Sequence, residues 1–368
     1  MVTEDVKLDE RYHSLMVDPG GCTIRFGAIG TGISEMRTVV GHPRYSQVVD
    51  EEIRHNPSQF YFGKDALDHR GVLHLDYPIE NGAITKWTAF RQLLGNIMNK
   101  IEHADRILIG LKNHFESKHM KKLSRIITDE LGASEFAFKH QAVLALYAME
   151  RPTGVVVDTG LNSTLIVPIV KGNIVTKAIR DIAIGGRQLT DFLRRRLHEK
   201  GYRFEKGIEQ DIVRNIKESV CKFPIEDFIE ADDSYYVLPS GLTLKLQNEI
   251  FETPILFFRP EMYEESIKPL HNQILEAITS CDAVDREDLL GNIILTGGSS
   301  KFPGFTERLT KELVGKSKSN EAVRVNSHKN RQHTVFEGGI KWIQDNPESS
   351  SWKSVFQNDV LESSYHFF

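Results

Sequence analysis

The chain has 368 residues, 40% hydrophobic and 26% charged, a length that predicts two sizeable lobes rather than a single core. Its formal net charge of −5 excludes a general electrostatic attraction to nucleic acid or to an anionic membrane. The polar opening and the lack of an apolar run near ~20 residues exclude a signal peptide and membrane insertion, and three cysteines without metal-like spacing favour the cytoplasm or the nucleus.

The first half of the chain predicts alternating strands and helices. Residues 15–17 predict a strand that ends at Asp18, and residues 23–28 predict its return. Residues 42–62 are mostly polar and have no clear period, which predicts a surface loop or a small insertion. Hydrophobic spacing then predicts a helix over 87–101, a strand over 106–111, and helices over 117–131 and 140–150.

The second half continues the alternation. The stretch VVDTGLNSTL (156–165) predicts a strand, a turn at Gly160 and a second strand, and residues 186–200 and 208–222 predict amphipathic helices. Residues 291–313 predict a strand, a glycine turn and a helix. Such alternation predicts α/β lobes built on mixed sheets.

One internal repeat stands out. The segments LMVDPGGCTIRFG (15–27) and VVVDTGLNSTLIV (155–167) share one plan, in which an apolar strand leads to an aspartate, a glycine turn and a returning strand. A single copy would indicate only a turn. Two copies predict two hairpins that face one ligand from two lobes.

Three glycine-containing stretches together predict nucleotide binding. They are DPGG (18–21), DTG (158–160) and ILTGGSSKFPG (294–304). Glycine lets backbone N–H groups approach phosphate oxygens closely, and the aspartates could hold a hydrated divalent cation. None of the three is a Walker loop, and each alone predicts no more than a turn.

These stretches belong to a wider pattern, because the sequence resembles actin and the actin-related proteins from Leu15 to Phe368. The matching phrases are VGHPR (40–44), RGVLHLDYPIENG (70–82), HQAVLALYA (140–148), GRQLTDFL (186–193), IVRNIKE (212–218), LTGGSSKFPG (295–304) and EGG (337–339). The resemblance implies an α/β, actin-like two-lobed ATPase fold, with duplicated ribonuclease H-like lobes around a nucleotide cleft. It implies a first lobe over 1–150 with a small inserted subdomain near 38–80, a second lobe over 151–334, and a return to the first lobe over 335–368.

The resemblance also implies roles for residues on the phosphate side. Asp18 and Asp158 match the family's two cation-side aspartates, which act through waters. The first phosphate loop is matched by Gly20 and Gly21, although a serine is usual at 21, and Gly160 opens the second loop. Arg25 stands where a phosphate-binding lysine is usual and presents a planar fork instead of a point charge. Gln141 matches the glutamine that positions the attacking water, so Gln141 and Asp158 are the expected catalytic residues.

On the adenosine side, Gly186, Arg214, Lys217 and Glu218 fall in segments that border the ribose and adenine. The segment that contacts the nucleotide is matched by Gly297, Gly298 and Ser299, and Phe302 matches an aromatic residue near the base. Gln332 replaces a usual lysine beside the base, which weakens that contact. The cofactors implied are ATP or ADP with Mg²⁺ or Ca²⁺.

Several positions depart from the family pattern. Leu161 stands where an acidic residue is usual, and Leu165 replaces the histidine that helps to order the hydrolytic water. Asn162 replaces a glycine, and asparagine tolerates left-handed backbone angles. Asn81 replaces a histidine that follows PIE. The second hairpin therefore keeps a phosphate-binding plan with fewer catalytic polar groups, which predicts a divergent member with weak, slow ATP hydrolysis.

Three functions are compatible with these features. The first is an ATP-binding cytoskeletal protein that polymerises into filaments in the cytoplasm, with its own copies and profilin-like or gelsolin-like proteins as partners. For that function, residues 42–62 and 266–270 match filament contacts by position. The second is a non-polymerising actin-related subunit of a larger complex, such as a chromatin remodeller or a motor adaptor. A metabolic kinase is the third, but no further aspartate stands out to face an acceptor hydroxyl.

Overall fold

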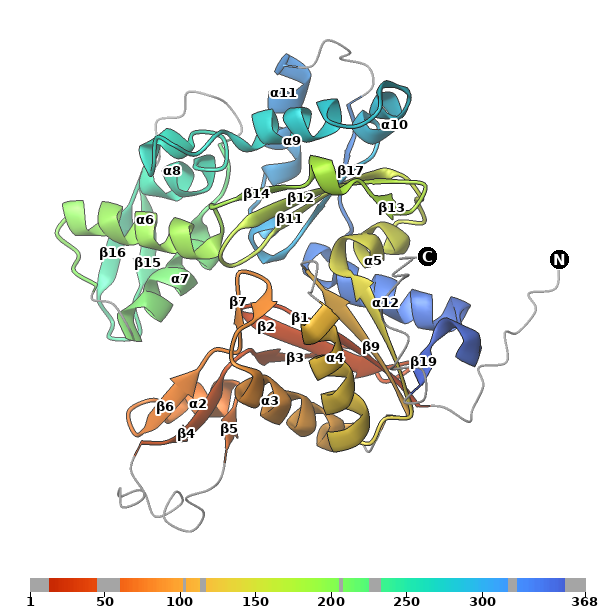
Figure 1. Cartoon of the computed structure of the whole chain (residues 1–368). Helices are drawn as coiled ribbons and strands as arrows, with labels where there is room; N and C mark the ends of the chain where they lie inside the picture. The colour runs from red at the N-terminus through yellow and green to blue at the C-terminus, as the bar shows by residue number, and fades with distance from the viewer. Residues whose placement is uncertain are drawn as a thin grey trace. The chain divides into compact units, whose positions relative to one another are not determined.

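The computed structural model describes residues 13–44, 60–101, 104–112, 117–204, 208–224, 233–316 and 323–354. The chain divides into two compact units. Unit 1 comprises Met1–Glu150 and His333–Phe368, and unit 2 comprises Arg151–Gln332. Each unit is built around a mixed sheet flanked by helices (Figure 1).

The main sheet of unit 1 contains the first predicted hairpin. In spatial order its strands are β19 (Lys353–Ser354), β10 (Glu135–His140), β9 (Arg106–Leu111), β1 (Ser14–Pro19), β2 (Thr23–Ala28) and β3 (Ser34–Arg37). Strand β1 pairs antiparallel with β2 and parallel with β9. The predicted strands at 15–17, 23–28 and 106–111 are confirmed, but Asp18 lies inside β1 rather than beyond its end.

Helices cover both faces of this sheet (Figure 1). They are α3 (Trp87–Lys100), α4 (Ser117–Arg125) with one π-helical turn after it (Ile126–Glu130), α5 (Gln141–Ala148) and α12 (Thr334–Asp345). Because successive strand residues point to opposite faces, Leu15 and Val17 pack into one cluster with Phe90 of α3. Met16 points the other way, against Gly339 of α12. The three helices predicted in this unit are therefore confirmed.

A smaller sheet extends unit 1 (Figure 1). It consists of β5 (Tyr61–Phe62), β4 (Val40–Pro43) and β6 (Leu73–Asp76), with α2 (Lys64–Asp68) packed on it, and the hairpin of β7 (Ile79–Glu80) and β8 (Ala83–Ile84) follows. Val39, Tyr61, Ala66 and Leu73 form its buried core. Of the two alternatives for 42–62, a surface loop is wrong at both ends, which are strands, and a small insertion agrees with this small sheet. Residues 45–59 lie outside the described part of the chain.

Unit 2 contains the second predicted hairpin. In spatial order its sheet comprises β13 (Asn173–Ile174), β12 (Thr164–Val170), β11 (Gly154–Thr159), β17 (Ile293–Thr296) and β18 (Val325–Asn326), and β14 (Arg180–Ile182) also pairs with β12. Strand β11 pairs antiparallel with β12 and parallel with β17. The inner strands of the two units therefore repeat one arrangement.

The helices of unit 2 enclose one apolar core. They are α6 (Gly186–Glu199), α7 (Ile208–Val220), α8 (Glu249–Ile255), α9 (Leu270–Thr279), α10 (Arg286–Leu290) and α11 (Phe305–Lys316), and β15 (Ser234–Val237) and β16 (Thr243–Leu246) form a separate hairpin. The fully buried side chains of Leu189, Ile216, Ile274 and Leu309 tie four of these helices to the sheet. Among the described helices, none is long and apolar enough to cross a membrane.

Candidate functional site

The two aspartates of the internal repeat occupy equivalent positions in two hairpins. In unit 1, Asp18 of β1 stands directly across from Arg25 of β2. In unit 2, Asp158 of β11 stands directly across from Leu165 of β12. The two hairpins therefore repeat the same strand register as well as the same sequence plan. The residue across from the aspartate is an arginine in unit 1 and a leucine in unit 2.

The turn after Asp18 requires glycine. A Cβ at Gly20 would lie 2.6 Å from the carbonyl oxygen of Thr23. The amide of Gly20 donates to that same oxygen over 3.2 Å, and the hydroxyl of Thr38 donates to the carbonyl of Gly20 over 2.6 Å. These bonds hold a tight loop at residues 20–22, with the backbone close to whatever binds there.

Asp18 is buried and bonded to a glutamine that follows β10, two strands away in the same sheet. The Nε2 of Gln141 donates to Oδ1 of Asp18 over 2.7 Å and to the carbonyl of Pro19 over 3.3 Å. Gln141 begins α5 directly after β10, and the Nδ1 of His140 caps that helix by accepting from the amide of Ala142 over 3.1 Å. The strand-to-helix turn therefore fixes the Gln141 amide against Asp18.

Arg25 is held by carboxylates. Its Nε lies 2.8 Å from Oε1 of Glu35 and its Nη1 lies 3.8 Å from Oδ2 of Asp18. The Nε2 of His333 also reaches Glu35, at 2.9 Å. Burial alone would raise the pKa of Glu35, but Arg25 and His333 outweigh it and lower that pKa. Glu35 and His333 were not identified from the sequence, because they are brought to Arg25 from β3 and from the start of α12.

In unit 2, the start of α6 closes onto the second hairpin turn. The amide of Gly186 donates to the carbonyl of Gly160 over 3.0 Å, and the amide of Arg187 donates to the carbonyl of Leu161 over 2.7 Å. A Cβ at Gly185 would lie 2.7 Å from the carbonyl oxygen of Leu161. Gly185 was not identified as a candidate from the sequence, although two successive glycines before a predicted helix indicate a tight turn there.

Two further segments meet this turn. The hydroxyl of Ser299 donates to the carbonyl of Gly160 over 3.1 Å. The buried Lys217 of α7 donates from Nζ to the carbonyl of Gly186 over 2.9 Å. Residues 160, 186, 217 and 299, chosen separately from the sequence, therefore form one group, named here the glycine cluster.

Gly297 lies beside Asp158. Its backbone has φ +93° and ψ 162°, a region that only glycine adopts freely. A Cβ there would collide with Oδ1 of Asp158 and come within 2.5 Å of the carbonyl oxygen of Thr159. A Cβ at the neighbouring Gly298 would meet no described atom within 4 Å. Gly297 thus packs against the hairpin, while Gly298 presents an open backbone surface.

The substituted residues of the second hairpin turn are partly enclosed. Leu165 is only 6% exposed, so its side chain is a packing residue. The Oδ1 of Asn162 is buried and lacks a hydrogen-bond partner among the described residues. The suggested left-handed backbone at Asn162 is not found, whereas Asn81 does adopt it, with φ 49°.

The remaining candidates of unit 2, which were expected to border the adenosine, lie in several segments. Arg214 pairs within its own helix, with Asp211 at 3.1 Å and Glu218 at 3.8 Å. Phe302 is buried and packs edge-on against Phe223. A hollow of about 250 Å³ is lined by Lys301, Lys329, Asn330, Arg331 and Gln332. Arg331 donates to the carbonyl of Ser300 over 2.7 Å, which joins the hollow to the strand–turn segment at Gly297.

The candidate residues of unit 1 and those of unit 2 were expected to bind the same nucleotide. Within unit 1, the structure brings together Asp18, Gly20, Arg25 and Gln141, and Gly21 lies in the same turn. Within unit 2, it brings the glycine cluster beside Gly297 and Asp158. Glu218 is exposed at the end of α7 and reaches only Arg214 among the contacts described here.

Comparison with known proteins gives a consistent result. A family model described as Actin matches residues 9–352. Among curated proteins, the chain is similar to a protein named "Centractin" from Schizosaccharomyces pombe, with 30% identity over 341 residues. That match covers 88% of this chain and 89% of the relative, so the similarity extends through both units.

Proposed function

Because this chain belongs to the actin family and has its two-lobed fold, we propose that it is an ATP-binding actin-related protein that works as a subunit of a larger protein complex. The observation that carries the nucleotide part is the glycine cluster. Four segments far apart in the sequence converge there, and the side chains of Ser299 and Lys217 bond to the carbonyls of Gly160 and Gly186.

The residues of each unit fit a phosphate-bearing ligand. Gly20 and Gly297 keep the hairpin turns tight, since a Cβ at either would collide with the hairpin itself, and Gly298 leaves open space in which backbone N–H groups can approach an anion. The unpartnered Oδ1 of Asn162 would accept a hydrogen bond from a water of a hydrated cation. Bound Mg²⁺–ATP would supply the phosphate chain and the cation; each unit offers one carboxylate at its hairpin for the waters of a hydrated cation, Asp18 in unit 1 and Asp158 in unit 2.

We propose that ATP hydrolysis is slow. Gln141 has its amide donor committed to Asp18, which orients the side chain. Opposite Asp158, Leu165 can neither donate nor accept a hydrogen bond. A positioned proton-transfer group typically contributes about 10²–10⁴-fold to a rate, so the site lacks a substantial part of that contribution.

Two observations favour a complex subunit over a filament protein. The curated relative reported above is named centractin and not actin. In addition, Leu270 was expected at a filament contact, but it is 1% exposed and belongs to the core of unit 2. The expectation is therefore wrong for Leu270, whereas Ser266 and Lys268 of the same segment are exposed. Most of the other segment expected at a filament contact, 42–62, including Tyr45, lies outside the described residues.

The nucleotide part is tested by calorimetry of the purified chain with ATP and Mg²⁺. We expect saturable binding that Asp158→Ala weakens, and Asp282→Ala serves as an exposed aspartate control from the same unit. Absence of binding by the wild type would rule out the nucleotide proposal.

The assembly part is tested by sedimentation of the pure protein with ATP, Mg²⁺ and salt, followed by electron microscopy. We expect monomers, and we expect the endogenous protein to elute from a sizing column with fixed stoichiometric partners. Filaments formed by the pure protein would establish self-assembly as its function instead.

A further inference from the structure

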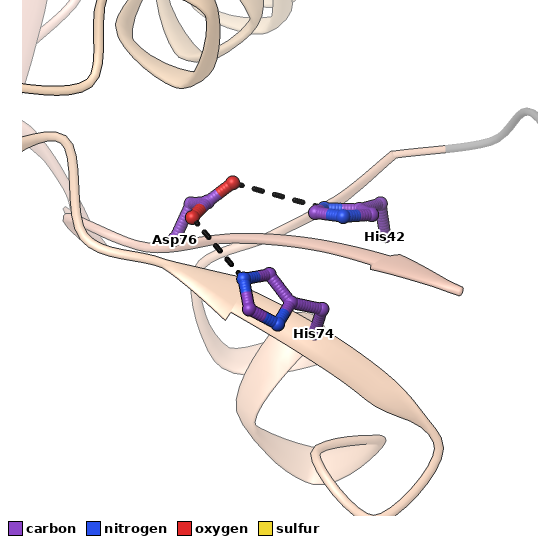
Figure 2. A group of neighbouring side chains, drawn as sticks. All are labelled: His42, His74 and Asp76. Atoms are coloured by element: carbon purple, nitrogen blue, oxygen red, sulfur yellow. Dashed lines mark ion pairs between the residues drawn. The ribbon is translucent and has the colours of Figure 1, made fainter. Parts of the chain in front are cut away.

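Three side chains of metal-ligating types gather on the small sheet of unit 1, which carries none of the residues proposed to bind nucleotide. They are His42 of β4 and His74 and Asp76 of β6 (Figure 2). Within the described ranges, this is the group of histidine, cysteine and carboxylate side chains close enough to hold one ion. Figure 2 shows Asp76 directed toward both imidazole rings.

The register of the two strands creates the group. His42 and His74 are direct partners in the antiparallel pair of β4 and β6. Asp76 follows His74 by one pleat repeat, so its side chain emerges on the same face. Leu73 points to the opposite face and forms the small core with Ala66. The three polar side chains therefore share the face that the core does not use.

The distances are close to those of a coordinated ion. Nδ1 of His42 lies 3.8 Å from Oδ2 of Asp76, and Nε2 of His74 lies 3.6 Å from Oδ1 of Asp76. All the ligand atoms lie within 4.8 Å of one another. Ligand bonds of about 2.0–2.2 Å in a tetrahedral site separate ligand atoms by roughly 3.3–3.6 Å. Small side-chain rotations of two partly exposed histidines would close the difference.

Lys86 is the competitor for Asp76. Its Nζ lies 2.6 Å from Oδ1 of Asp76, and 43% of its side chain is exposed. An exposed ion pair of this kind contributes about 0–1 kcal/mol, so an ion that binds two imidazoles and the carboxylate can displace the lysine. The long lysine side chain can then extend into solvent.

We propose that His42, His74 and Asp76 form a Zn²⁺-binding site. Two imidazole nitrogens and one carboxylate suit a borderline transition-metal ion, whereas Mg²⁺ and Ca²⁺ prefer sets of oxygen ligands. Three protein ligands leave a fourth coordination position open, which water or a donor from a protein partner would fill. His74, with 59% of its side chain exposed, gives the ion direct access from solvent.

The experiment is calorimetric titration of the full-length protein with ZnCl₂, in excess Mg²⁺ and without free nucleotide, which would itself chelate zinc. We expect one saturable Zn²⁺ per chain. His74→Ala and Asp76→Asn should each weaken binding by at least about tenfold, the scale seen even for outer-shell changes, and Lys86→Met should tighten it. Co²⁺ should give the visible absorption bands of a four-coordinate N/O site in the wild type and not in His74→Ala or Asp76→Asn.

Two controls make the result specific. His69→Ala removes a histidine of the same unit that faces the single carboxylate of Asp65, and Cys22→Ser removes a partly exposed thiol; neither change should alter Zn²⁺ affinity. Circular dichroism checks folding, with His74→Gln as a second variant. Absence of Zn²⁺ binding by the wild type, or binding that survives both ligand substitutions unchanged, would overturn the proposal.

Discussion

The Nε2 of Gln141 donates a hydrogen bond to Oδ1 of Asp18 over 2.7 Å, between two side chains that are both buried. The bond joins the start of α5 to the end of β1, so it serves the fold as well as the proposed site. A hydrogen bond to a charged group contributes roughly 1.5–3 kcal/mol.

We therefore expect Gln141→Ala to lower the free energy of unfolding by about 2 kcal/mol. Gln141→Glu should lower it further, because a second carboxylate would stand beside Asp18 at hydrogen-bond distance. Urea denaturation of the nucleotide-free protein measures both. Equal stability of the two variants would show that the Asp18 carboxylate is not charged or not close to residue 141 in solution.

Leu165→His should accelerate single-turnover phosphate release, because it restores a hydrogen-bonding group directly across from Asp158. The gain should reach about a hundredfold at most, the lower end for a positioned proton-transfer group, since the ring must fit a space that encloses leucine. Leu165→Met is the size-matched apolar control and should leave the rate unchanged. Fast release by the wild type, abolished in Gln141→Ala, would mean that Gln141 suffices without the histidine.

Gly297→Ala should destabilise unit 2 while Gly298→Ala does not. The first substitution forces a side chain into a backbone region that costs about 1–3 kcal/mol and pushes Cβ against Asp158 and Thr159. The second adds a methyl group that meets nothing within 4 Å. Thermal unfolding without nucleotide distinguishes them, and equal midpoints for the two variants would contradict the described backbone.

Because of Lys139, we expect the free energy of unfolding to rise at alkaline pH. Burial, and then the nearby charge of Lys353, lower the pKa of Lys139 to about 8, and its Nζ lies 4.8 Å from the centre of the Trp342 ring. Between pH 8 and the ordinary value of 10.5, the unfolded chain binds more protons at this residue than the folded chain. Stability therefore increases with pH across that window, by an amount on the order of 3 kcal/mol at 1.36 kcal/mol per pKa unit.

The comparison variant for this effect is Lys139→Met, which cannot titrate. At neutral pH this variant should be more stable than the wild type, although losing the cation–π contact reduces its advantage by ~0.5–1 kcal/mol. The difference in stability between the variant and the wild type should shrink as pH rises from 8 to 10.5. Urea denaturation at several pH values measures it. A constant difference across the window would mean that Lys139 keeps its ordinary pKa.

Leu270→Asp should unfold unit 2 instead of selectively weakening self-association. Leu270 begins α9 and is buried in the main core of unit 2, and a buried unpaired carboxylate costs several kcal/mol. Ser266→Asp, in the exposed part of the same segment, should leave the unfolding midpoint within about 0.5 kcal/mol of the wild type. A folded, stable Leu270→Asp protein would place this side chain at the surface in solution.

Much of the local structure was predictable. Hydrophobic periodicity located the helices at 87–101 and 186–200 closely, because an amphipathic helix must repeat its apolar residues every three to four positions. The two hairpins were predictable from apolar strands around an aspartate and a glycine turn. The expectation for Leu270 failed, because its position was matched to a surface in related proteins, although Leu270, Ile274 and Ile278 repeat at helical spacing and share the buried face of α9.

The sequence by itself determined the order of strands and helices, the repeated hairpin and the glycines of its turns, since these depend on neighbours along the chain. Only the tertiary structure decided that Glu35 and His333 meet at Arg25, that Ser299 and Lys217 reach residues 160 and 186, and that His42 stands across from His74. Contacts of this kind depend on strand register and helix packing between distant segments. Strand register and helix packing depend on burying the apolar faces of whole sheets and helices at the same time, and no short stretch of sequence specifies them.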